Sequence, residues 1–566
     1  MKSVFRSKKQ EVRSKKYSPF YLLAFFPFFL FTFSFSLPCS AQNDFEIAKN
    51  VDIFVSILKE LNAKYADEIN PTDLVTKAIH GMLGTLDPYS VYYPESQIED
   101  VKLMSTGQYG GIGAVIQQYG KNAVIAELFE NAPAQKAGLR AGDIILKINN
   151  QNVQNKTSSD VSTILKGQPG TKLNIEIERP TDGKKHTFDV AREDIKFPPV
   201  PFSGMLKNQI GYINLNQFTD KASAEVKDAF MKLKDQGMKY LILDLRYNGG
   251  GLLTEAVNIM NIFVDQNVKI AETKGKIKEQ NNIFRTKNSV IDKEIPVAVL
   301  VNGASASASE IVAGAFQDLD RGVIIGKKTF GKGLVQNIVP LSYNTSFKIT
   351  VSKYYIPSGR CVQSIEYFDR DTLSAAPHIP DSLATPYKTK NGRMVYDKGG
   401  IEPDIITPDS IPSNLLVALM LNNIIFDFCN EYAAKHETIL PANQFKLSDT
   451  EYKQFADYVN TKNFEYKTET EEVLDELKEI AQSEKYFAAI ESTYNDIIKK
   501  INNEKSSEIY KFKEELSEYI ANEIVARYYF QKGRVEHQLT TDPDVKTAME
   551  ILLDSNRYKA ILSGKK

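Results

Sequence analysis

The feature that most constrains this chain is a strand-turn-helix pattern that ends in a glycine-flanked lysine. It begins with the apolar run Pro296–Val301 and turns at an Asn-Gly pair, as a buried strand does. Ser307-Ala-Ser-Glu310 then has the S-x-x-E form of a capping box, ahead of an apolar helical segment. A second apolar run, Val323–Gly326, leads towards Lys332. The pattern predicts two buried strands joined by a helix, with a serine at the first strand-to-helix junction.

A serine at such a junction lies beside unpaired backbone N–H groups, which suit an oxyanion. It still needs a base, and Lys332 is the local candidate if its pKa falls from about 10.4 towards neutrality. The alternative is that Ser307 is only a helix cap and Lys332 a solvated turn lysine. Spacing alone does not choose Ser307 over Ser305 or Ser309. A histidine from elsewhere is the other source of a base, and the chain has five: His80, His186, His378, His436 and His537.

The run S-A-S-A-S-E-I, the later Q-D pair and T-F-G-K-G-L-V-Q together resemble the C-terminal processing peptidases, also called tail-specific proteases. The resemblance implies that Ser307 is the nucleophile and Lys332 the general base. It also implies that Gln336 orients the lysine. Asp318, of the Q-D pair, is expected to support the site electrostatically or structurally.

A second family landmark is the strand Tyr240–Arg246 followed by Tyr-Asn-Gly-Gly-Gly. The backbone N–H groups of Gly250 or Gly251, with that of Ala308, are the expected oxyanion donors. Residues 326–332 also fit the first seven positions of a phosphate-binding loop. The next residue is a glycine and a strand-like segment follows, so we reject nucleotide binding.

Residues 108–178 resemble a PDZ domain, on the strength of a glycine loop and the later K-A-G-L-R-A-G-D. The loop Gly110, Gly111, Ile112 and Gly113 would bind a terminal carboxylate through backbone N–H groups. Ala114–Gln117 would be the strand that accepts an incoming peptide. Arg140 either couples peptide capture to activation, as in some relatives, or pairs with Asp143 at the surface.

The N-terminus has the form of an export signal. Seven lysines and arginines precede the apolar run Phe20–Leu37, and a C-x-A sequence ends at Ala41. We expect cleavage after Ala41, with an uncleaved membrane anchor as the alternative, so the body of the protein is expected in the periplasm or cell envelope.

The formal charge of −1 does not suggest a nucleic-acid binder. Cys361 and Cys429 either pair or remain two thiols.

The expected fold is a multidomain α/β protein. Residues 1–41 are the signal, 42–104 a helical segment, 105–195 an inserted PDZ domain, 196–408 a crotonase-like α/β peptidase core, and 409–566 a helical C-terminal domain. The last domain has charged helices with one apolar face, which suits packing, oligomerisation or partner docking.

The leading hypothesis is a serine endopeptidase that captures free C-termini of protein substrates and cuts near them, with no cofactor and no metal. One alternative is a PDZ scaffold with an inactive core. The other is an acyl-CoA enzyme, since the family core resembles the crotonase fold. The sequence leaves proximity to a membrane and homo-oligomer formation open.

Overall fold

The computed structural model describes residues 40–365, 367, 381–397, 399–408, 411–462 and 464–564. These residues divide into two compact units, with the boundary between Ile79 and His80. The expected export segment lies outside the described residues, except for its last two positions. Among the described helices, none combines the length and apolar character needed to cross a membrane.

The segment ahead of the PDZ domain is helical, as expected, except at one short strand. Its elements are α1 (Ser40–Lys64), α2 (Pro71–Gly84), β1 (Val91–Tyr93) and α3 (Ile98–Thr106). The expectation of a helical segment was wrong at β1, which pairs antiparallel with β18 (Ser346–Tyr355) of the peptidase core. The Val-Tyr-Tyr sequence of β1 is rich in residues that favour strands, and the partner strand provides the hydrogen bonds.

The PDZ region forms an antiparallel sheet around its own core, in the strand order β3-β4-β5-β7-β8 with β6 on β5. Because β3 has a single partner, it is an edge strand. A separate ribbon pairs β2 with β9. The elements are β2 (Gln108–Gly111), β3 (Ala114–Tyr119), β4 (Asn122–Leu128), α4 (Pro133–Ala137), β5 (Ile144–Ile148), β6 (Gln151–Asn152), α5 (Ser158–Leu165), β7 (Lys172–Arg179), β8 (Lys184–Ala191) and β9 (Glu193–Lys196).

The peptidase core is built on a six-stranded sheet in the order β10-β11-β12-β15-β16-β21. All its pairings are parallel except that of the edge strand β10 with β11. Parallel strands end at the same edge, so the segments that follow β12 and β15 meet there. The strands are β10 (Phe202–Met205), β11 (Ile210–Asn214), β12 (Tyr240–Asp244), β15 (Val297–Val301), β16 (Val323–Gly326) and β21 (Ile405–Ile406).

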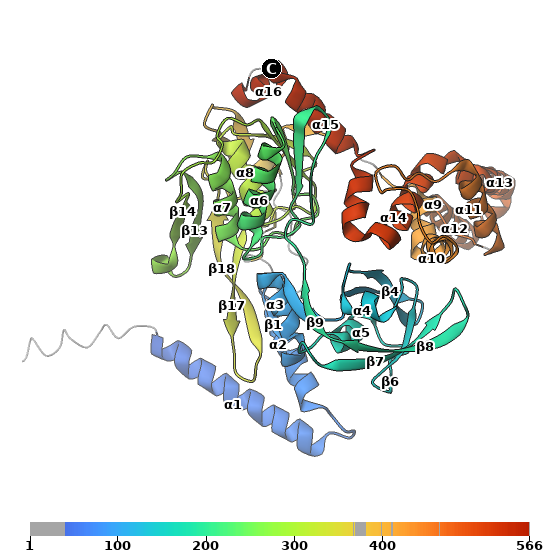
Figure 1. Cartoon of the computed structure of the whole chain (residues 1–566). Coiled ribbons are helices and arrows are strands. Elements are labelled where there is room, and N and C mark those ends of the chain that lie inside the picture. The colour runs from blue at the N-terminus through green and yellow to red at the C-terminus, as the bar shows by residue number, and fades with distance from the viewer. Residues whose placement is uncertain are drawn as a thin grey trace, which may run out of the picture. The chain divides into compact units, whose positions relative to one another are not determined.

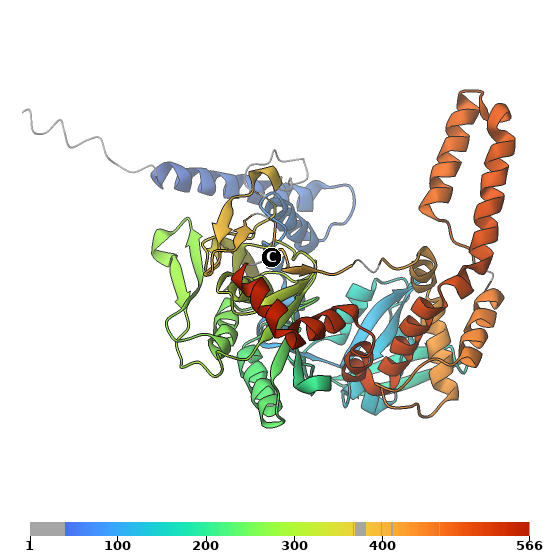
Figure 2. The same cartoon turned by 90° about the horizontal axis from the view of Figure 1, so that it is seen from above.

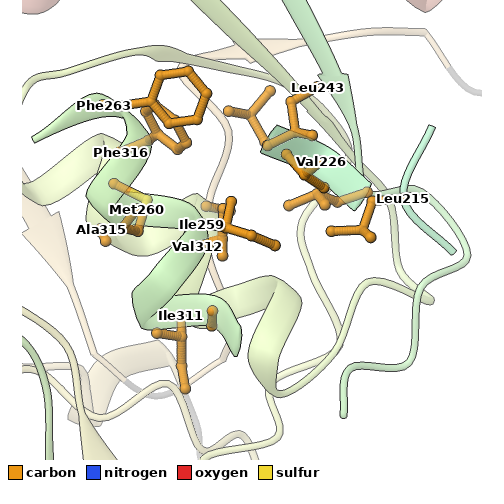
Figure 3. Close-up of a cluster of buried hydrophobic side chains, with 14 of the residues drawn as sticks. Leu215, Val226, Leu243, Ile259, Met260, Phe263, Ile311, Val312, Ala315 and Phe316 are labelled. Carbon is orange, nitrogen blue, oxygen red and sulfur yellow. The ribbon is translucent and has the colours of Figure 1, made fainter. Parts of the chain in front are cut away.

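Helices cover both faces of this sheet (Figure 1). One face packs against α6 (Ala222–Asp235), α7 (Leu253–Phe263) and α8 (Ala308–Asp318). Figure 3 shows part of that core, where side chains of α7 meet those of α8, and the rings of Phe263 and Phe316 lie 5.3 Å apart between centroids. The close packing fixes α8, and therefore the serine that precedes it.

The other face of the sheet is covered by the last two helices of the chain, α15 (Pro543–Leu553) and α16 (Ser555–Ser563). The Tyr558 hydroxyl bonds to both the N–H and the carbonyl of Val297, at 3.0 and 3.2 Å. The C-terminal segment therefore contributes to the peptidase core as well as to the helical domain.

A second sheet has the strand order β1-β18-β13-β14, with β17 on the other edge of β18. It contains β13 (Lys269–Gly275), β14 (Asn282–Arg285), β17 (Leu334–Pro340) and β18. Strand β17 begins shortly after Lys332 in the chain. A small hairpin pairs β19 (Pro386–Lys388) with β20 (Met394–Tyr396) in the expected surface excursion. Short 3₁₀ turns lie at Glu95–Gln97, Lys207–Gln209, Lys278–Gln280 and Asp381–Leu383.

The remaining C-terminal helices contribute unequally to a separate apolar core, whose buried side chains come from residues 415–459 and 516–525. They are α9 (Asn414–Leu421), α10 (Ile424–Lys435), α11 (Asp449–Thr461), α12 (Glu469–Ser483), α13 (Phe487–Lys511) and α14 (Lys513–Gln538). Helices α12 and α13 run side by side as the orange hairpin of Figure 2. Cys429 is buried here, and both it and Cys361 are free thiols, so the disulfide alternative was wrong.

Candidate active site

Ser307 lies between β15 and α8 in a strained backbone conformation. Its φ of 58° and ψ of −114° are rare for a residue with a side chain, and such strain is typical of functional sites. Ser305 and Ser309 are fully buried, and their hydroxyls donate to the carbonyls of Leu245 and Asn248 at 2.8 Å each. Ser307 is half-buried and lines a cavity of about 810 Å³. The structure therefore separates Ser307 from its two neighbours, which spacing alone did not.

Glu310 connects the serine to the lysine. Its Oε2 accepts the backbone N–H groups of Ser307 and Lys332, at 2.8 Å each. Its Oε1 accepts the Gly331 N–H at 2.7 Å and the Thr329 hydroxyl at 2.6 Å. Burial raises the pKa of Glu310, and these four hydrogen bonds oppose that rise. The capping pattern predicted the contact with Ser307, but nothing local predicted that the same carboxylate would also hold the lysine loop.

Lys332 lines the same cavity as Ser307. Burial, and secondarily the nearby charge of Lys348, lower the pKa of Lys332 to about 8, whereas Glu310 and Asp87 act in the opposite direction. The Nζ lies 4.4 Å from the centroid of the Tyr89 ring. No hydrogen bond joins the Lys332 amine to the Ser307 hydroxyl among the described residues. The two groups line one cavity, and no hydrogen bond between them is present in the described part of the chain.

Gln336, expected to orient the lysine, lines the same cavity as Ser307 and Lys332, but its side chain is hydrogen-bonded to another residue. It is on β17, directly after an irregularity in the pairing with β18. Its side-chain amide donates to the Thr350 hydroxyl at 3.2 Å. Among the described residues Gln336 makes no hydrogen bond with Lys332, and its role in orienting the lysine stays a prediction.

Gly250, one of the expected oxyanion donors, is already engaged. Its N–H donates to the side-chain oxygen of Asn248 at 2.9 Å. It has a φ of 101°, and a Cβ at this position would lie 2.8 Å from the Cβ of Ser307 and 2.7 Å from the Ala306 carbonyl. Glycine is required here because the backbone passes directly against the serine.

Ala308 and Gly251 are better placed as donors. Ala308 is the first residue of α8, so its N–H has no partner within the helix. Gly251 forms an isolated parallel bridge with Phe218. In this bridge the Phe218 N–H donates to the Gly250 carbonyl at 3.0 Å, and the Phe218 carbonyl accepts the Leu252 N–H at 2.7 Å. The N–H of Gly251 itself therefore faces away from Phe218, and Ala308 and Gly251 both line the cavity of Ser307.

Asp318 lies at the far end of α8 from Ser307. It forms an ion pair with Arg360 at 2.9 Å, in which both side chains are almost completely buried. Its other carboxylate oxygen accepts the Ser358 N–H at 2.9 Å. These contacts give Asp318 a structural role and no contact with the reacting groups.

The alternative in which a histidine acts as the base for Ser307 has no supporting contact among the described residues. Of the described histidines, His80, His186, His436 and His537, none hydrogen-bonds to Ser307. His378 lies outside the described residues.

The rejection of a phosphate-binding loop agrees with the structure, because Lys332 leads into strand β17 rather than into a helix.

The PDZ loop residues Gly110, Gly111, Ile112 and Gly113 are all buried beside the start of edge strand β3. The Gly110 N–H is taken by the Glu99 carboxylate at 2.5 Å, and Gly111 belongs to the β2–β9 ribbon. Ile112 and Gly113 therefore remain as the predicted carboxylate-binding positions of this loop. Helix α5 flanks β3, and its Ser158 N–H donates to Gln118 at 2.8 Å.

Arg140 does not pair with Asp143 through its side chain. Asp143 binds the guanidinium of Arg179 at 2.7 and 2.8 Å, and accepts only the backbone N–H of Arg140. The expected surface ion pair was therefore wrong. The Arg140 side chain is exposed, and its coupling role stays a prediction.

Models of known families match three parts of the chain. Residues 209–371 match Peptidase family S41, residues 124–179 match the PDZ domain, and residues 415–552 match the probable PDZ-protease C-terminal helical domain.

Two curated relatives each match more than half of the chain. The carboxy-terminal-processing protease of Bartonella bacilliformis is 35% identical over 332 residues, which are 58% of this chain and 75% of that protein. A probable CtpA-like serine protease of Staphylococcus aureus (strain MRSA252) is 33% identical over 317 residues, 55% of this chain and 62% of the relative.

Among solved structures, a photosystem II D1 C-terminal processing protease is 27% identical, with a TM-score of 0.35, over 63% of this chain and 88% of that one. The peptide-bound PDZ domain of a carboxy-terminal protease from Vibrio cholerae is 27% identical, with a TM-score of 0.15, over 16% of this chain and 99% of that one.

The chain is therefore a serine-type peptidase that carries a PDZ domain, on a mixed α/β fold with helical N- and C-terminal segments. It belongs to the carboxy-terminal-processing protease family, since it covers three quarters of the Bartonella protein at 35% identity.

Proposed function

We propose that this peptidase captures the free C-terminus of an unfolded protein on its PDZ domain and cuts near it with a Ser307–Lys332 dyad. The observation that carries the proposal is the shared cavity, in which a buried lysine with a pKa of about 8 accompanies a strained serine. A serine nucleophile needs a neutral amine as its base, and a lysine with this pKa is neutral in part of its population at neutral pH.

In this mechanism the Ser307 hydroxyl attacks the substrate carbonyl while the neutral Lys332 amine takes its proton. The N–H groups of Ala308 and Gly251 donate to the oxyanion that forms. The protonated lysine then gives its proton to the leaving amine, and an acyl-serine remains. Water hydrolyses the acyl group, with Lys332 again acting as the base. For the dyad to work, Lys332 must leave the Tyr89 ring and approach Ser307.

Substrate capture uses the PDZ groove. A terminal carboxylate binds the N–H groups around Ile112 and Gly113, and the peptide adds to edge strand β3 beside α5. The supporting features are the glycine loop and the unpaired edge of β3 in the described sheet.

The basic residues and the apolar run at the N-terminus support export to the periplasm or cell envelope.

The test is degradation of an unfolded protein with an apolar C-terminus. Ser307→Ala and Lys332→Ala are compared with Ser203→Ala and Lys293→Ala, which change the same residue types at exposed positions. Loss of cleavage in the first pair alone, with slower cleavage of a C-terminally amidated substrate, supports the proposal. Normal cleavage by Lys332→Ala would assign the base to another residue. Tail binding without any cleavage would favour a PDZ scaffold.

A further inference from the structure

The amine of Lys332 is held against an aromatic ring that comes from outside the peptidase sheet. Tyr89 belongs to the turn before β1, in the segment that precedes the PDZ domain. Its ring centroid lies 4.4 Å from the lysine Nζ. The attraction between an ammonium and the face of an aromatic ring acts at this distance. It stabilises the protonated amine and gives nothing comparable to the neutral one.

The Tyr89 ring is held in place by its own segment. Asp87 accepts the N–H groups of Tyr89 and Ser90, at 2.8 Å each. The Ser90 hydroxyl donates to Asp87 at 3.0 Å and accepts the N–H of Thr350 on β18 at 3.3 Å. Strand β1 then continues the attachment by pairing with β18. The ring is therefore anchored to the same sheet that carries the lysine into β17.

The Tyr89 ring also packs edge-on against Tyr367, with centroids 5.9 Å apart. Burial, and then the hydrogen bond between the Tyr89 and Tyr367 hydroxyls, raise the pKa of Tyr89 well above its usual range. Tyr89 is therefore a neutral phenol at any working pH, and it acts on the lysine through its ring face.

The charged groups that face Lys332 come from three elements. Lys348 on β18 disfavours the ammonium, while Glu310 on α8 and Asp87 favour it. Lys348 itself lies over the ring of Tyr93, 5.7 Å from its centroid. The turn and strand 87–93 thus contact both lysines of this end of the cavity through aromatic rings.

We propose that Tyr89 is a positioning residue that holds Lys332 in its protonated form, apart from Ser307, in the resting enzyme. The proposal rests on the proposed role of Lys332 as the base. Because the neutral amine gains little from the ring, loss of the proton releases Lys332 towards Ser307. The segment ahead of the PDZ domain therefore sets the pH at which the base becomes available.

The test measures how readily Lys332 gives up its proton, whether or not the protein cleaves anything. The rate at which acetic anhydride acylates Lys332 is followed by mass spectrometry from pH 6 to pH 11, in the full chain carrying Ser307→Ala. The variants are Tyr89→Leu, Tyr89→Met and Tyr89→Phe. Tyr92→Leu is the matched control, since Tyr92 lies in the same segment and packs against His80. Thermal unfolding identifies any variant that does not fold.

Removing the ring is expected to lower the midpoint for acylation of Lys332 by about 0.5 to 1 pH unit. Tyr89→Phe keeps the ring face and is expected to keep the wild-type midpoint, as is Tyr92→Leu. An unchanged midpoint in both Tyr89→Leu and Tyr89→Met would overturn the proposal. A raised midpoint for acylation in these variants would also overturn the proposal, because it would mean that the ring acts by excluding water. So would a midpoint in Tyr89→Phe that falls as far as in Tyr89→Leu.

The same variants with Ser307 intact give a second readout. The acid limb of kcat/KM is expected to move to lower pH in Tyr89→Leu, by the same amount as the acylation midpoint. If the wild type cleaves nothing, the proposed function fails while the acylation experiment still decides the role of Tyr89. If the acylation midpoint moves and the acid limb does not, Lys332 is not the base and the proposal falls with it.

Discussion

The backbone N–H of Lys332 donates to Oε2 of Glu310 at 2.8 Å. The same oxygen accepts the N–H of Ser307, also at 2.8 Å. One buried carboxylate thus fixes the backbone at both members of the proposed dyad. These bonds use the backbone of the two residues and neither of their side chains.

The first prediction concerns this carboxylate. Glu310→Gln replaces one of its two acceptor oxygens with an NH₂ group that faces donors. We expect the free energy of unfolding to fall by about 2 to 4 kcal/mol, since hydrogen bonds to a charged group are worth about 1.5 to 3 kcal/mol each. We also expect labelling of Ser307 by a fluorophosphonate to slow by about tenfold or more, because a displaced oxyanion donor costs that much or more.

Thr329→Val is the matched control for Glu310→Gln. It removes a hydroxyl that donates to Glu310, but it leaves the bonds to the Ser307 and Lys332 N–H groups. It is expected to reduce stability and to keep the labelling rate within about twofold of the wild type. Equal labelling rates in wild type and Glu310→Gln would show that the carboxylate does not position the serine.

The second prediction follows from the pKa of Lys332, about 8, which is lowered mainly by burial. Only the neutral amine accepts a proton, and about one tenth of it is neutral at pH 7. We therefore expect kcat/KM to rise about tenfold per pH unit below pH 8 and to level off above it. A rate that is flat from pH 6 to pH 9 would contradict a lysine base.

The third prediction is that Lys332→Met is inactive yet more stable than the wild type. The folded pKa lies below the ordinary lysine value of 10.5, so the folded state binds the proton less tightly than the unfolded state does. Below pH 8 the folded protein carries the whole cost of the buried ammonium, and that cost disappears as pH rises towards 10.5.

The methionine variant removes that cost at every pH. We expect it to gain about 1 to 3 kcal/mol in urea unfolding at pH 7, with the gain shrinking by pH 10. Lys293→Met, at an exposed position, is expected to change stability by less than about 0.5 kcal/mol. A destabilised Lys332→Met would mean that the ammonium makes favourable contacts that outweigh its burial.

The fourth prediction concerns peptide capture. Gly113 has a φ of 72°, and a Cβ there would lie 2.3 Å from that of Ala132, so Gly113→Ala must displace the carboxylate loop. Binding of a labelled peptide with a free C-terminus is expected to weaken by about tenfold or more, since each charge-assisted hydrogen bond lost is worth at least about 1.5 kcal/mol.

Gly120→Ala is the control for the loop variant. Gly120 has a similar φ of 57°, but no atom lies within 4 Å of a Cβ built there. It is expected to cost about 1 kcal/mol of stability and to leave peptide affinity unchanged. If both alanine variants weaken binding equally in fluorescence anisotropy, the carboxylate does not bind at the Gly113 loop.

Local pattern predicted the elements around Ser307 and Lys332 because each depends on neighbours in sequence. An apolar run, a turn and an S-x-x-E cap fix a strand-to-helix junction wherever it lies. The contacts of Glu310 with Lys332, and of Tyr89 with the same lysine, join segments whose meeting depends on the whole fold. The resemblance supplied the roles of the residues but not their resting geometry, which keeps Gln336 with Thr350.

The C-terminal helices illustrate the same limit. The one-sided apolar pattern of residues 409–566 predicts helices that pack together, but a helix face does not say which surface it covers. In the structure Val545 and Tyr558 pack on the central sheet beside Tyr212 and Ile242. The three-residue strand β1 was missed for a related reason, since its partner lies more than 250 residues away in the chain.

The last prediction concerns Asp318 and Arg360, which form a buried ion pair at 2.9 Å. Breaking such a pair from one side leaves an uncompensated buried charge, which costs about 3 to 5 kcal/mol. We therefore expect Asp318→Asn to lower the free energy of unfolding by that amount. The double change Asp318→Leu with Arg360→Met removes both charges. We expect it to recover most of the loss, because apolar residues of similar volume can often replace a buried ion pair without loss of stability. Cleavage by the folded fraction, measured as kcat per labelled Ser307, is expected to be unchanged in the double variant. A stable double variant that no longer cleaves would give Asp318 an electrostatic role in the site beyond its structural one.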